Sequence, residues 1–213
     1  MQIIIRDLGL CDWLVVSENM NHFTKNRKDW TCDELWLVEH YPVFTHGLSE
    51  KKIESNYIQD IPVFFSNRGG RITYHGPGQL VLYILLNLKR NHITFRNFIH
   101  IIEQIIIQVL LFFSISAHII KDQPGVYINN QKICSLGFRI MKGCSLHGAS
   151  LNIDMNLTPF KYINPCGRKD MIMTQICHHN KNVTINMVKE VLIKVFCQNF
   201  KIQKYFKTKV EHD

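Results

Sequence analysis

Residues 68–79 read RGGRITYHGPGQ, with four glycines and one proline among twelve residues. Apolar, strand-like segments flank this stretch at Val63–Ser66 and Leu80–Leu88. Glycine reaches positive φ values and lets a ligand approach the backbone closely, while a proline between two glycines fixes a turn. Polar side chains on the same stretch, among them Arg68 and His75, favour a binding loop over a hairpin turn that only reverses the chain. The stretch matches neither a phosphate-binding P-loop nor the dinucleotide-binding GxGxxG pattern.

Around this loop, strand-like segments outnumber helical ones. The predicted strands are Gln2–Arg6, Glu34–Glu39, Val63–Ser66, Arg71–Tyr74, Leu80–Leu88, Val126–Ile128, Lys132–Met141 and Ser145–Ile153. Asn129 and Asn130, which tolerate left-handed turn conformations, separate two of them. Because the strands form hairpin-like neighbours and do not alternate strictly with helices, we predict an α+β fold. Its core is a mixed, largely antiparallel sheet covered by helices.

Three helices are predicted from apolar periodicity and capping residues. The first spans Trp13–Arg27 and has a mixed amphipathic pattern. Thr94 caps the second and Thr184 caps the third. In the second helix the apolar positions recur with a helical period; they are Phe98, Ile101, Ile102, Ile105, Val109, Phe112 and Phe113. Each helix is therefore expected to pack one apolar face on the sheet.

Length and composition fit a single domain. Of the 213 residues, 46% are hydrophobic and 20% charged, which is enough apolar material for a sizeable core. No internal repeat, low-complexity tract or linker-like composition divides the sequence. We therefore expect one domain over residues 1–213.

The formal net charge of +8 favours an acidic partner, such as nucleic acid, an anionic membrane surface or an acidic protein. Drift of an AT-rich genome toward Lys, Ile and Asn accounts for the same charge, so charge alone does not choose among them. A nucleic-acid-binding regulator is one class of function that the charge permits. The sequence lacks the helix-turn-helix signal, zinc pattern or basic stripe with interleaved aromatics that this class would need.

Compartment is indicated by three features. The N-terminal sequence MQIIIRDLGL has neither the basic region nor the small-residue cleavage site of a signal peptide. The most apolar stretch, Phe98–Ile115, is interrupted by polar residues such as Glu103 and Gln104, whereas a membrane span needs about 20 apolar residues. Seven cysteines without a repeating spacing indicate free thiols in a reducing compartment. We expect a cytoplasmic protein that does not enter a membrane.

Two later positions are candidates for acid–base and nucleophilic chemistry. Lys132 begins a predicted strand, where a lysine is ordinarily solvated; it becomes a candidate base only if burial disfavours its charged form. Cys166 lies between a proline and a glycine in the sequence INPCG, residues 163–167. A cysteine in such a tight, uncrowded turn suits an accessible nucleophile. Cys134, Cys144, Cys177 and Cys197 lie in apolar or mixed segments and are interpreted as buried packing residues.

Residues 147–152 read HGASLN. Their small side chains, at Gly148, Ala149 and Ser150, either leave room for a ligand chain beside a strand or let a helix pack closely on the sheet. The residues alone favour helix packing.

Cys177, His178 and His179 offer three possible metal ligands in a row. No CxxC pair, spaced histidine pair or HExxH motif accompanies them, so no metal is expected. A Ser-His-Asp triad lacks the GxSxG motif that would support it.

Four motifs, in this order, resemble the lipoyl (octanoyl) transferase family of bacterial lipoate biosynthesis. They are RGG-x-x-TYHGPGQ at Arg68–Gln79, KICSLG at Lys132–Gly137, HG-x-[AS]-LN at His147–Asn152 and NPCG at Asn164–Gly167. The stretch Trp36–Thr45 is also similar to the family, and the resemblance extends from about Leu8 to the final helix. Three departures are the side chains at His46 and Ala149, which adjust the shape of the pocket, and the charged residues Arg168–Asp170 after NPCG.

The resemblance implies the catalytic-domain fold shared with biotin and lipoate protein ligases. Cys166 matches the nucleophile that forms an acyl thioester, and Lys132 matches the lysine that activates it and serves as general acid and base. The implied substrate-binding residues are Arg68, Gly69, Gly70, Arg71, Ile72, Thr73, Tyr74, His75, Ser135, Leu136, Gly137, Gly148, Ala149 and Ser150. No cofactor or metal is implied, because the donor itself carries a phosphopantetheine thioester.

The implied reaction transfers an octanoyl group from octanoyl-acyl carrier protein to a lysine amine of lipoyl domains, through an acyl-cysteine intermediate. This is the first step of protein lipoylation from endogenous octanoate. The implied partners are acyl carrier protein, the lipoyl domains of 2-oxoacid dehydrogenase complexes and the glycine cleavage H protein, with neither nucleic acid nor membrane.

Two alternatives share this resemblance. One is an ATP-dependent lipoate or biotin protein ligase, which would use a lysine without a nucleophilic cysteine. The other is an inactive relic that only binds a carrier protein. The presence of both Cys166 and Lys132 argues against each of them.

Overall fold

The computed structural model describes residues 1–50, 55–165 and 171–209. Within these ranges an eight-stranded sheet has the order β12-β1-β2-β7-β11-β10-β9-β8. Its strands are β1 (Gln2–Cys11), β2 (Asp33–His40), β7 (Gln79–Leu85), β8 (His118–Ile120), β9 (Gln123–Ile128), β10 (Gln131–Met141), β11 (Cys144–Asn152) and β12 (Lys204–Lys209). Strand β1 pairs in parallel with β2 and β12, and the other neighbours are antiparallel. The prediction of a mixed, largely antiparallel sheet is confirmed.

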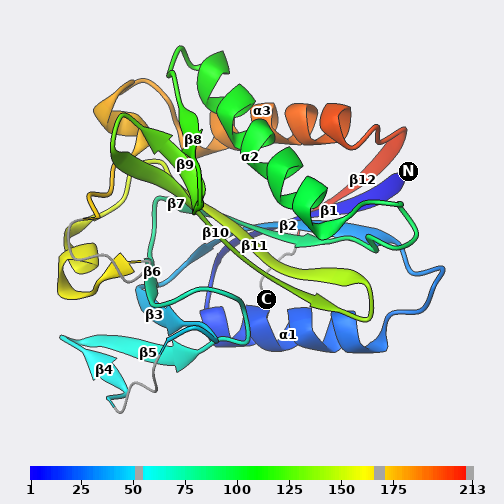
Figure 1. Ribbon diagram of the computed structural model, residues 1–213, viewed down its shortest axis with the longest axis horizontal. Helices are drawn as coiled ribbons and strands as arrows, with labels where there is room; N and C mark the ends of the chain where they lie inside the picture. The colour runs from blue at the N-terminus through cyan, green and yellow to red at the C-terminus, as the bar shows by residue number, and fades with distance from the viewer. Residues whose placement is uncertain (51–54, 166–170, 210–213) are drawn as a thin grey trace.

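A smaller sheet of order β4-β5-β3-β6 lies beside the large one (Figure 1). Its strands are β3 (Val43–His46), β4 (Tyr57–Ile58), β5 (Ile61–Phe65) and β6 (Thr73–His75). The helices are α1 (Trp13–Asn26), α2 (Phe95–Phe112) and α3 (Ile185–Asn199), with short 3-10 turns η1 (Thr158–Tyr162) and η3 (Ile176–His178).

The two faces of the large sheet bury different helices because side chains alternate along a strand. On β2, Leu35 and Leu37 belong to the main core, which contains the apolar faces of α2 and α3. Trp36 and Val38 point to the opposite face and pack with residues of α1, among them Met20. Figure 1 shows the resulting layers, with α2 and α3 on one side of the sheet and α1 on the other.

The helix predictions are confirmed, including their caps. The Thr94 side chain accepts a hydrogen bond from the Asn97 N–H, and Thr184 does the same for Met187. By length and composition, α2 is the helix of the described chain that could cross a membrane. Its residues such as Phe98 are nevertheless part of the main core. The expectation that Phe112 packs in the core is wrong, because this residue at the end of α2 is 68% exposed.

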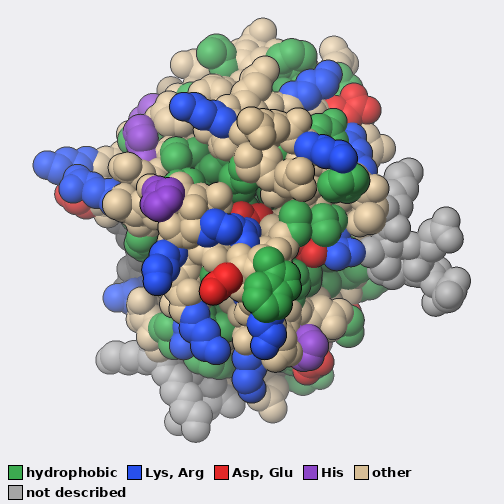
Figure 2. Space-filling view, turned by 90° about the vertical axis from the view of Figure 1, so that its right-hand side faces the viewer, with side chains coloured by type: hydrophobic (Ala, Val, Ile, Leu, Met, Phe, Trp, Pro, Cys, Tyr) green, Lys and Arg blue, Asp and Glu red, His purple; other side chains and the backbone are tan. Residues whose placement is uncertain are grey.

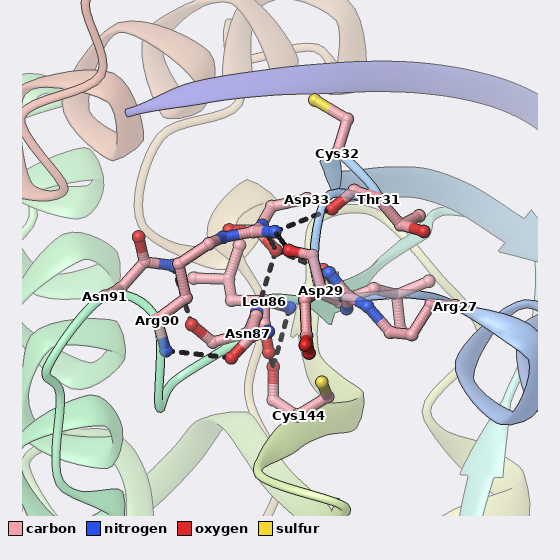
Figure 3. Close-up of polar contacts among 12 residues, drawn as sticks. Arg27, Asp29, Thr31, Cys32, Asp33, Leu86, Asn87, Arg90, Asn91 and Cys144 are labelled. Carbon is pink, nitrogen blue, oxygen red and sulfur yellow. Dashed lines mark hydrogen bonds and ion pairs between the residues drawn. The ribbon is translucent and has the colours of Figure 1, made fainter.

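A buried ion cluster joins one end of these layers (Figure 3). The Asp33 carboxylate at the start of β2 lies 2.6 Å from Nη2 of Arg27 and 2.7 Å from Nη2 of Arg90. It also accepts hydrogen bonds from the Asn87 N–H and the Asn91 side chain. Arg27 follows α1, and Arg90 precedes α2, so the cluster ties both helices to the sheet.

Some strands were not predicted, namely β3, β4, β8 and β12. Each is short or rich in polar residues, and β3 and β12 also depend on partners distant in sequence. Strand β12, for example, pairs with β1 from the opposite end of the chain. The predicted strand Arg71–Tyr74 begins only at Thr73, because the Ile72 N–H is directed to the Glu50 carboxylate.

Candidate active site

The glycine-rich loop is held between a neighbouring turn and strand β10. The Gly69 N–H donates to the Phe138 carbonyl over 3.0 Å. The Leu48 N–H donates to the Arg68 carbonyl over 2.9 Å. A Cβ on Gly47 would lie 2.8 Å from the same Arg68 oxygen, which explains the glycine at this close approach. These backbone hydrogen bonds hold the loop against the sheet, and its role as a binding loop stays a prediction.

The Arg68 guanidinium points into this docked region. Its Nη2 donates to the Thr45 carbonyl over 2.7 Å and to Thr45 Oγ1 over 3.0 Å. Thr45 Oγ1 lies 3.3 Å from Nε2 of His75, and Nδ1 of His75 lies 2.7 Å from Oε1 of Gln79. Because Oε1 only accepts, Nδ1 carries the proton and Nε2 accepts from Thr45. Burial, with neighbouring cationic groups, lowers the pKa of His75 to about 3, so this ring is neutral at pH 7.

This hydrogen-bond chain continues toward Lys132. Gln79 Nε2 donates to Asn152 Oδ1 over 2.9 Å, and Asn152 Nδ2 donates to the Thr174 carbonyl over 2.9 Å. The Thr174 N–H in turn donates to the Lys132 carbonyl over 2.9 Å. Three of the four sequence motifs thus meet through one connected network.

A cavity of about 70 Å³ lies beside this network. All the predicted substrate-binding residues line it except Gly69 and Tyr74. The Tyr74 ring instead packs against Phe44 and Phe160 in the core of the small sheet. Residues that the sequence analysis did not place in the site also line the cavity, namely Trp13, Ser66, Val81, Tyr83 and His147.

Of these, His147 belongs to the HGASLN motif, so the sequence contained a signal that could have placed it in the site. Trp13 lies in a predicted helix and Tyr83 in a predicted strand, and the sequence pattern of both segments indicated only packing in the core. They are brought to the cavity by packing between elements distant in sequence.

The floor of the cavity requires small residues. Gly137 on β10 pairs with Gly148 on β11. A Cβ on Gly137 would lie 3.0 Å from Cδ of Arg68, and one on Gly148 would overlap the carbonyl oxygen of Leu82 on β7. At Gly148 itself the closest atoms belong to the neighbouring strand β7, while helix α1 packs on β11 as the helix-packing interpretation expects.

The rear wall is aromatic and uncharged. Trp13 stacks on Phe64 with 5.6 Å between ring centroids. Behind the wall, Nδ1 of His40 lies 3.1 Å from the Cys11 carbonyl, so it donates, and Nε2 lies 2.8 Å from the Tyr83 hydroxyl, from which it accepts. Burial lowers the pKa of His40 to about 4. The buried His147, which hydrogen-bonds Asn67, likewise has its pKa lowered to about 3, chiefly by burial.

A second cavity, of about 360 Å³, adjoins the first and shares Gly70, Arg71 and Leu136 with it. Lys132 lines this second cavity, yet its side chain is only 1% exposed. Its Nζ lies 5.4 Å from the centroid of the Tyr127 ring. The sequence left open whether Lys132 is solvated or withdrawn into a pocket, and the structure has it withdrawn.

The predicted nucleophile Cys166 lies outside the described residues, as do the charged residues Arg168–Asp170. After this gap, Met171 lines the same cavity as Lys132. The Lys132 N–H donates to the Ile172 carbonyl over 2.8 Å, so the returning chain is paired with the start of β10. Among the other cysteines, Cys134 and Cys144 are buried as expected, whereas Cys177 and Cys197 are only half-buried.

The neighbouring trio of possible metal ligands is engaged in other contacts. Nε2 of His179 lies 3.0 Å from Thr174 Oγ1, and Nε2 of His178 lies 3.1 Å from Gln175 Nε2. Within the described part of the chain, no group of three or more His, Cys, Asp and Glu side chains is arranged to hold a metal ion.

Residues 16–197 match the family model of the lipoyl protein ligase A/B catalytic domain. The octanoyltransferase of Buchnera aphidicola subsp. Acyrthosiphon pisum (strain APS) is 53% identical over 192 residues, which cover 90% of this chain and 91% of that protein. The octanoyltransferase of Erwinia tasmaniensis is 48% identical over 200 residues, covering 94% and 90% of the two chains.

Solved structures agree on the fold. Lipoate-protein ligase A bound with ATP has a TM-score of 0.81 at 14% identity, covering 100% of this chain and 90% of that one. A bipartite archaeal lipoate protein ligase described with its E2 lipoyl domain, from Thermoplasma acidophilum, has a TM-score of 0.75 at 13% identity and covers 100% of this chain and 89% of that one. Biotin protein ligase from Aquifex aeolicus, in complex with biotin and ATP, has a TM-score of 0.56 at 13% identity, covering 93% and 70%.

The expected fold of the lipoate and biotin ligases is confirmed. The chain belongs to the lipoyl protein ligase A/B catalytic domain family and, like the octanoyltransferases to which it is about half identical, it is an acyltransferase.

Proposed function

We propose that this chain moves an octanoyl group from an acyl carrier protein thioester to a lysine of a lipoyl domain, through a thioester on Cys166. The observation that carries the proposal is the burial of Lys132 on the wall of a cavity that adjoins the motif-lined one. A lysine withdrawn from water beside a binding cavity suits acid–base work far better than a solvated one. The octanoyltransferase relatives supply the acyl group of the proposal.

In the first transfer, the Cys166 sulfur attacks the carbonyl carbon of the donor thioester. An ordinary thiol has a pKa of about 8.5, so only a few per cent is thiolate at neutral pH and it needs activation. Lys132 provides it, either as an ammonium that stabilises the thiolate or as a neutral amine that accepts the thiol proton. A new carbon–sulfur bond forms to Cys166 and the bond to the phosphopantetheine sulfur breaks. The leaving thiolate takes its proton from the Lys132 ammonium, which is left as the neutral amine.

In the second transfer, the lysine amine of the lipoyl domain attacks the acyl-Cys166 carbonyl. The amide bond forms, the Cys166 sulfur leaves as thiolate, and the proton lost by the amine passes to Lys132. No ATP, metal or other cofactor takes part in this proposal, because the donor thioester already supplies the driving force.

Both transfers develop negative charge on the carbonyl oxygen, which needs hydrogen-bond donors. The turn at Gly76–Gly78 is a candidate from its sequence, but Pro77 has no N–H, and the Gly78 N–H is directed to the Glu39 carboxylate over 2.9 Å. Gly78 is therefore not assigned this role. The backbone N–H groups of Gly76 and Cys166 are the donors that we propose.

For the acyl chain we propose the smaller cavity. Its lining includes the apolar side chains of Ile72, Leu136 and Ala149. The histidines at or behind its wall, His75 and His147 among them, are neutral at pH 7. These apolar side chains favour a hydrocarbon chain, beside the charged Arg68 and Arg71 that line the same cavity.

The proposed partners are acyl carrier protein and, as acceptors, the lipoyl domains of 2-oxoacid dehydrogenase complexes and the glycine cleavage H protein, all in the cytoplasm. The archaeal ligase described with its E2 lipoyl domain supports an acceptor of this kind. The net charge of +8 would speed encounters with acidic partners. On the face drawn in Figure 2, Lys and Arg are scattered and form no single patch, which fits diffuse steering. Transfer that runs equally fast at low and high ionic strength would refute the steering.

The test of the proposal is the intact mass of the protein after incubation with octanoyl-acyl carrier protein. We expect the wild type to gain one octanoyl group that hydroxylamine removes, and Cys166→Ala to gain none. Cys32→Ala, which removes a half-buried thiol elsewhere, is the matched control and should acylate normally. No adduct on any variant, together with transfer to a lipoyl domain only from free acid and ATP, would indicate a ligase instead.

A further inference from the structure

Glu103 is the one acidic residue of α2, and the site described above does not include it. The helix otherwise presents apolar side chains to the core, yet Glu103 is only 8% exposed. A buried carboxylate without a partner would be strongly destabilising. Its Oε1 accepts a hydrogen bond from the Gly125 N–H over 3.4 Å. Glu103 therefore reaches from α2 to strand β9, the last but one of the large sheet.

The Lys132 side chain packs against the same glycine, Gly125. A Cβ on Gly125 would overlap Cε of Lys132 and would lie 3.1 Å from Nζ. The φ of Gly125 is +135°, a backbone conformation that side-chain-bearing residues rarely adopt. Gly125 thus packs against the buried Lys132 side chain and donates its N–H to the buried Glu103 carboxylate. Both side chains therefore contact the same residue of the backbone.

Electrostatics couples the two side chains directly. Burial raises the pKa of Glu103, while the Gly125 N–H and the charges of His100 and Lys132 act to lower it. His100 is exposed on the same helix, whereas Lys132 is buried. Other groups near Lys132 are the Tyr127 ring beneath its Nζ, the buried Cys134 two residues along β10, and Arg71 and Asp122 on the cavity wall.

We propose that Glu103 is a positioning residue for Lys132: its carboxylate holds the Gly125 backbone, against which the Lys132 side chain packs. The catalytic relevance rests on the proposed function, in which Lys132 is the acid and base. Opposite charges favour each other's ionised forms, whereas burial favours the neutral amine. Loss of the Glu103 charge must therefore let Lys132 release its proton at lower pH.

The direct test is the titration of the Lys132 side chain, followed by NMR on protein with 13C-labelled lysine and assigned with Lys132→Met. In Glu103→Gln, which keeps an acceptor for the Gly125 N–H but loses the charge, we expect the midpoint to fall by about one pH unit, the lower end of what a nearby opposite charge contributes. Glu103→Asp, which keeps the charge, should remain closer to the wild type. An unchanged midpoint in Glu103→Gln would overturn the inference.

The pH profile of acyl transfer gives the functional readout. Whichever protonation state of Lys132 is active, the limb that reports its titration should move to lower pH in Glu103→Gln. Glu18→Gln makes the same chemical change on the exposed face of α1 and should leave both readouts unchanged. If Cys166→Ala still transfers the acyl group normally, the proposed function fails, while the NMR titration continues to decide the coupling of Glu103 to Lys132.

Discussion

Gln79 donates a hydrogen bond through Nε2 to Oδ1 of Asn152 over 2.9 Å, both side chains being almost completely buried. Gln79 ends the glycine-rich loop, and Asn152 ends β11. Asn152 passes the connection to Thr174, whose N–H holds the carbonyl of Lys132. These hydrogen bonds connect the loop that lines one cavity to Lys132, which lines the other. The loop and the lysine therefore belong to one hydrogen-bonded unit.

Replacing Asn152 by leucine should break this unit. The Thr174 carbonyl and the Gln79 amide would each lose a partner inside the protein, and an unsatisfied buried polar group costs about 1–3 kcal/mol. We expect the free energy of unfolding, measured in urea, to fall by about that amount or more, with slower acyl transfer. Asn156→Ala on the surface is the control; an equal loss there would contradict a special role for Asn152.

Gly125→Ala should disturb Lys132 more than an ordinary glycine substitution would. The added Cβ would overlap Cε of Lys132 and lie 2.6 Å from the Cys134 carbonyl oxygen, in addition to the strain of the positive φ. Overpacking of this kind costs about 1–3 kcal/mol. Gly9→Ala isolates the backbone strain, because Gly9 has φ +63° but open space around it. Transfer should fall sharply only in Gly125→Ala; equal losses of transfer in the two variants would show that crowding of Lys132 is not the cause.

Asp33→Asn should lower stability without altering the site. The substitution leaves the buried Arg27 guanidinium without its carboxylate partner, and breaking a buried ion pair in this way costs about 3–5 kcal/mol. The expected result is a lower urea midpoint, with near-normal transfer at temperatures where the protein remains folded. Asp29→Asn, on the surface beside the cluster, should change the midpoint little. Loss of transfer in folded Asp33→Asn would show that the cluster does more than join elements.

The free energy of unfolding should decrease as the pH falls from 6 to 4. The unfolded chain binds protons on histidine near pH 6.5, whereas His40 in the folded protein has its pKa lowered to about 4 by burial. Between these values the unfolded state binds more protons, so stability is present above pH 6.5 and is lost as the pH falls through 4. His40→Gln, which can still donate to Cys11 and accept from Tyr83, should reduce the slope by up to about 1.4 kcal/mol per pH unit. His22→Gln, exposed on α1, should leave the slope unchanged; an unchanged slope in His40→Gln would refute the assignment.

Much of this architecture follows from local sequence patterns. Continuous apolar runs in Glu34–Glu39 and Leu80–Leu88 predict strands. Thr94 and Thr184 mark the starts of α2 and α3, because a threonine side chain satisfies an N–H that the first turn leaves open. The motifs likewise predict most of the lining of the smaller cavity, but not Trp13, Ser66, Val81 and Tyr83. The strands and helix caps depend on neighbours within a few residues, so the sequence alone determines them.

Contacts between distant segments decided the rest. Tyr74 belongs to a motif, but its ring is turned into the core of the small sheet. Trp13 and Tyr83 read as core residues, but they line the cavity once α1 and β7 are packed. The same strand-start lysine could be solvated or buried, and Gly125, Tyr127 and the returning chain at Ile172 withdraw Lys132 from water. Burial and electrostatic coupling arise from atoms brought together only by folding, and no local pattern records them.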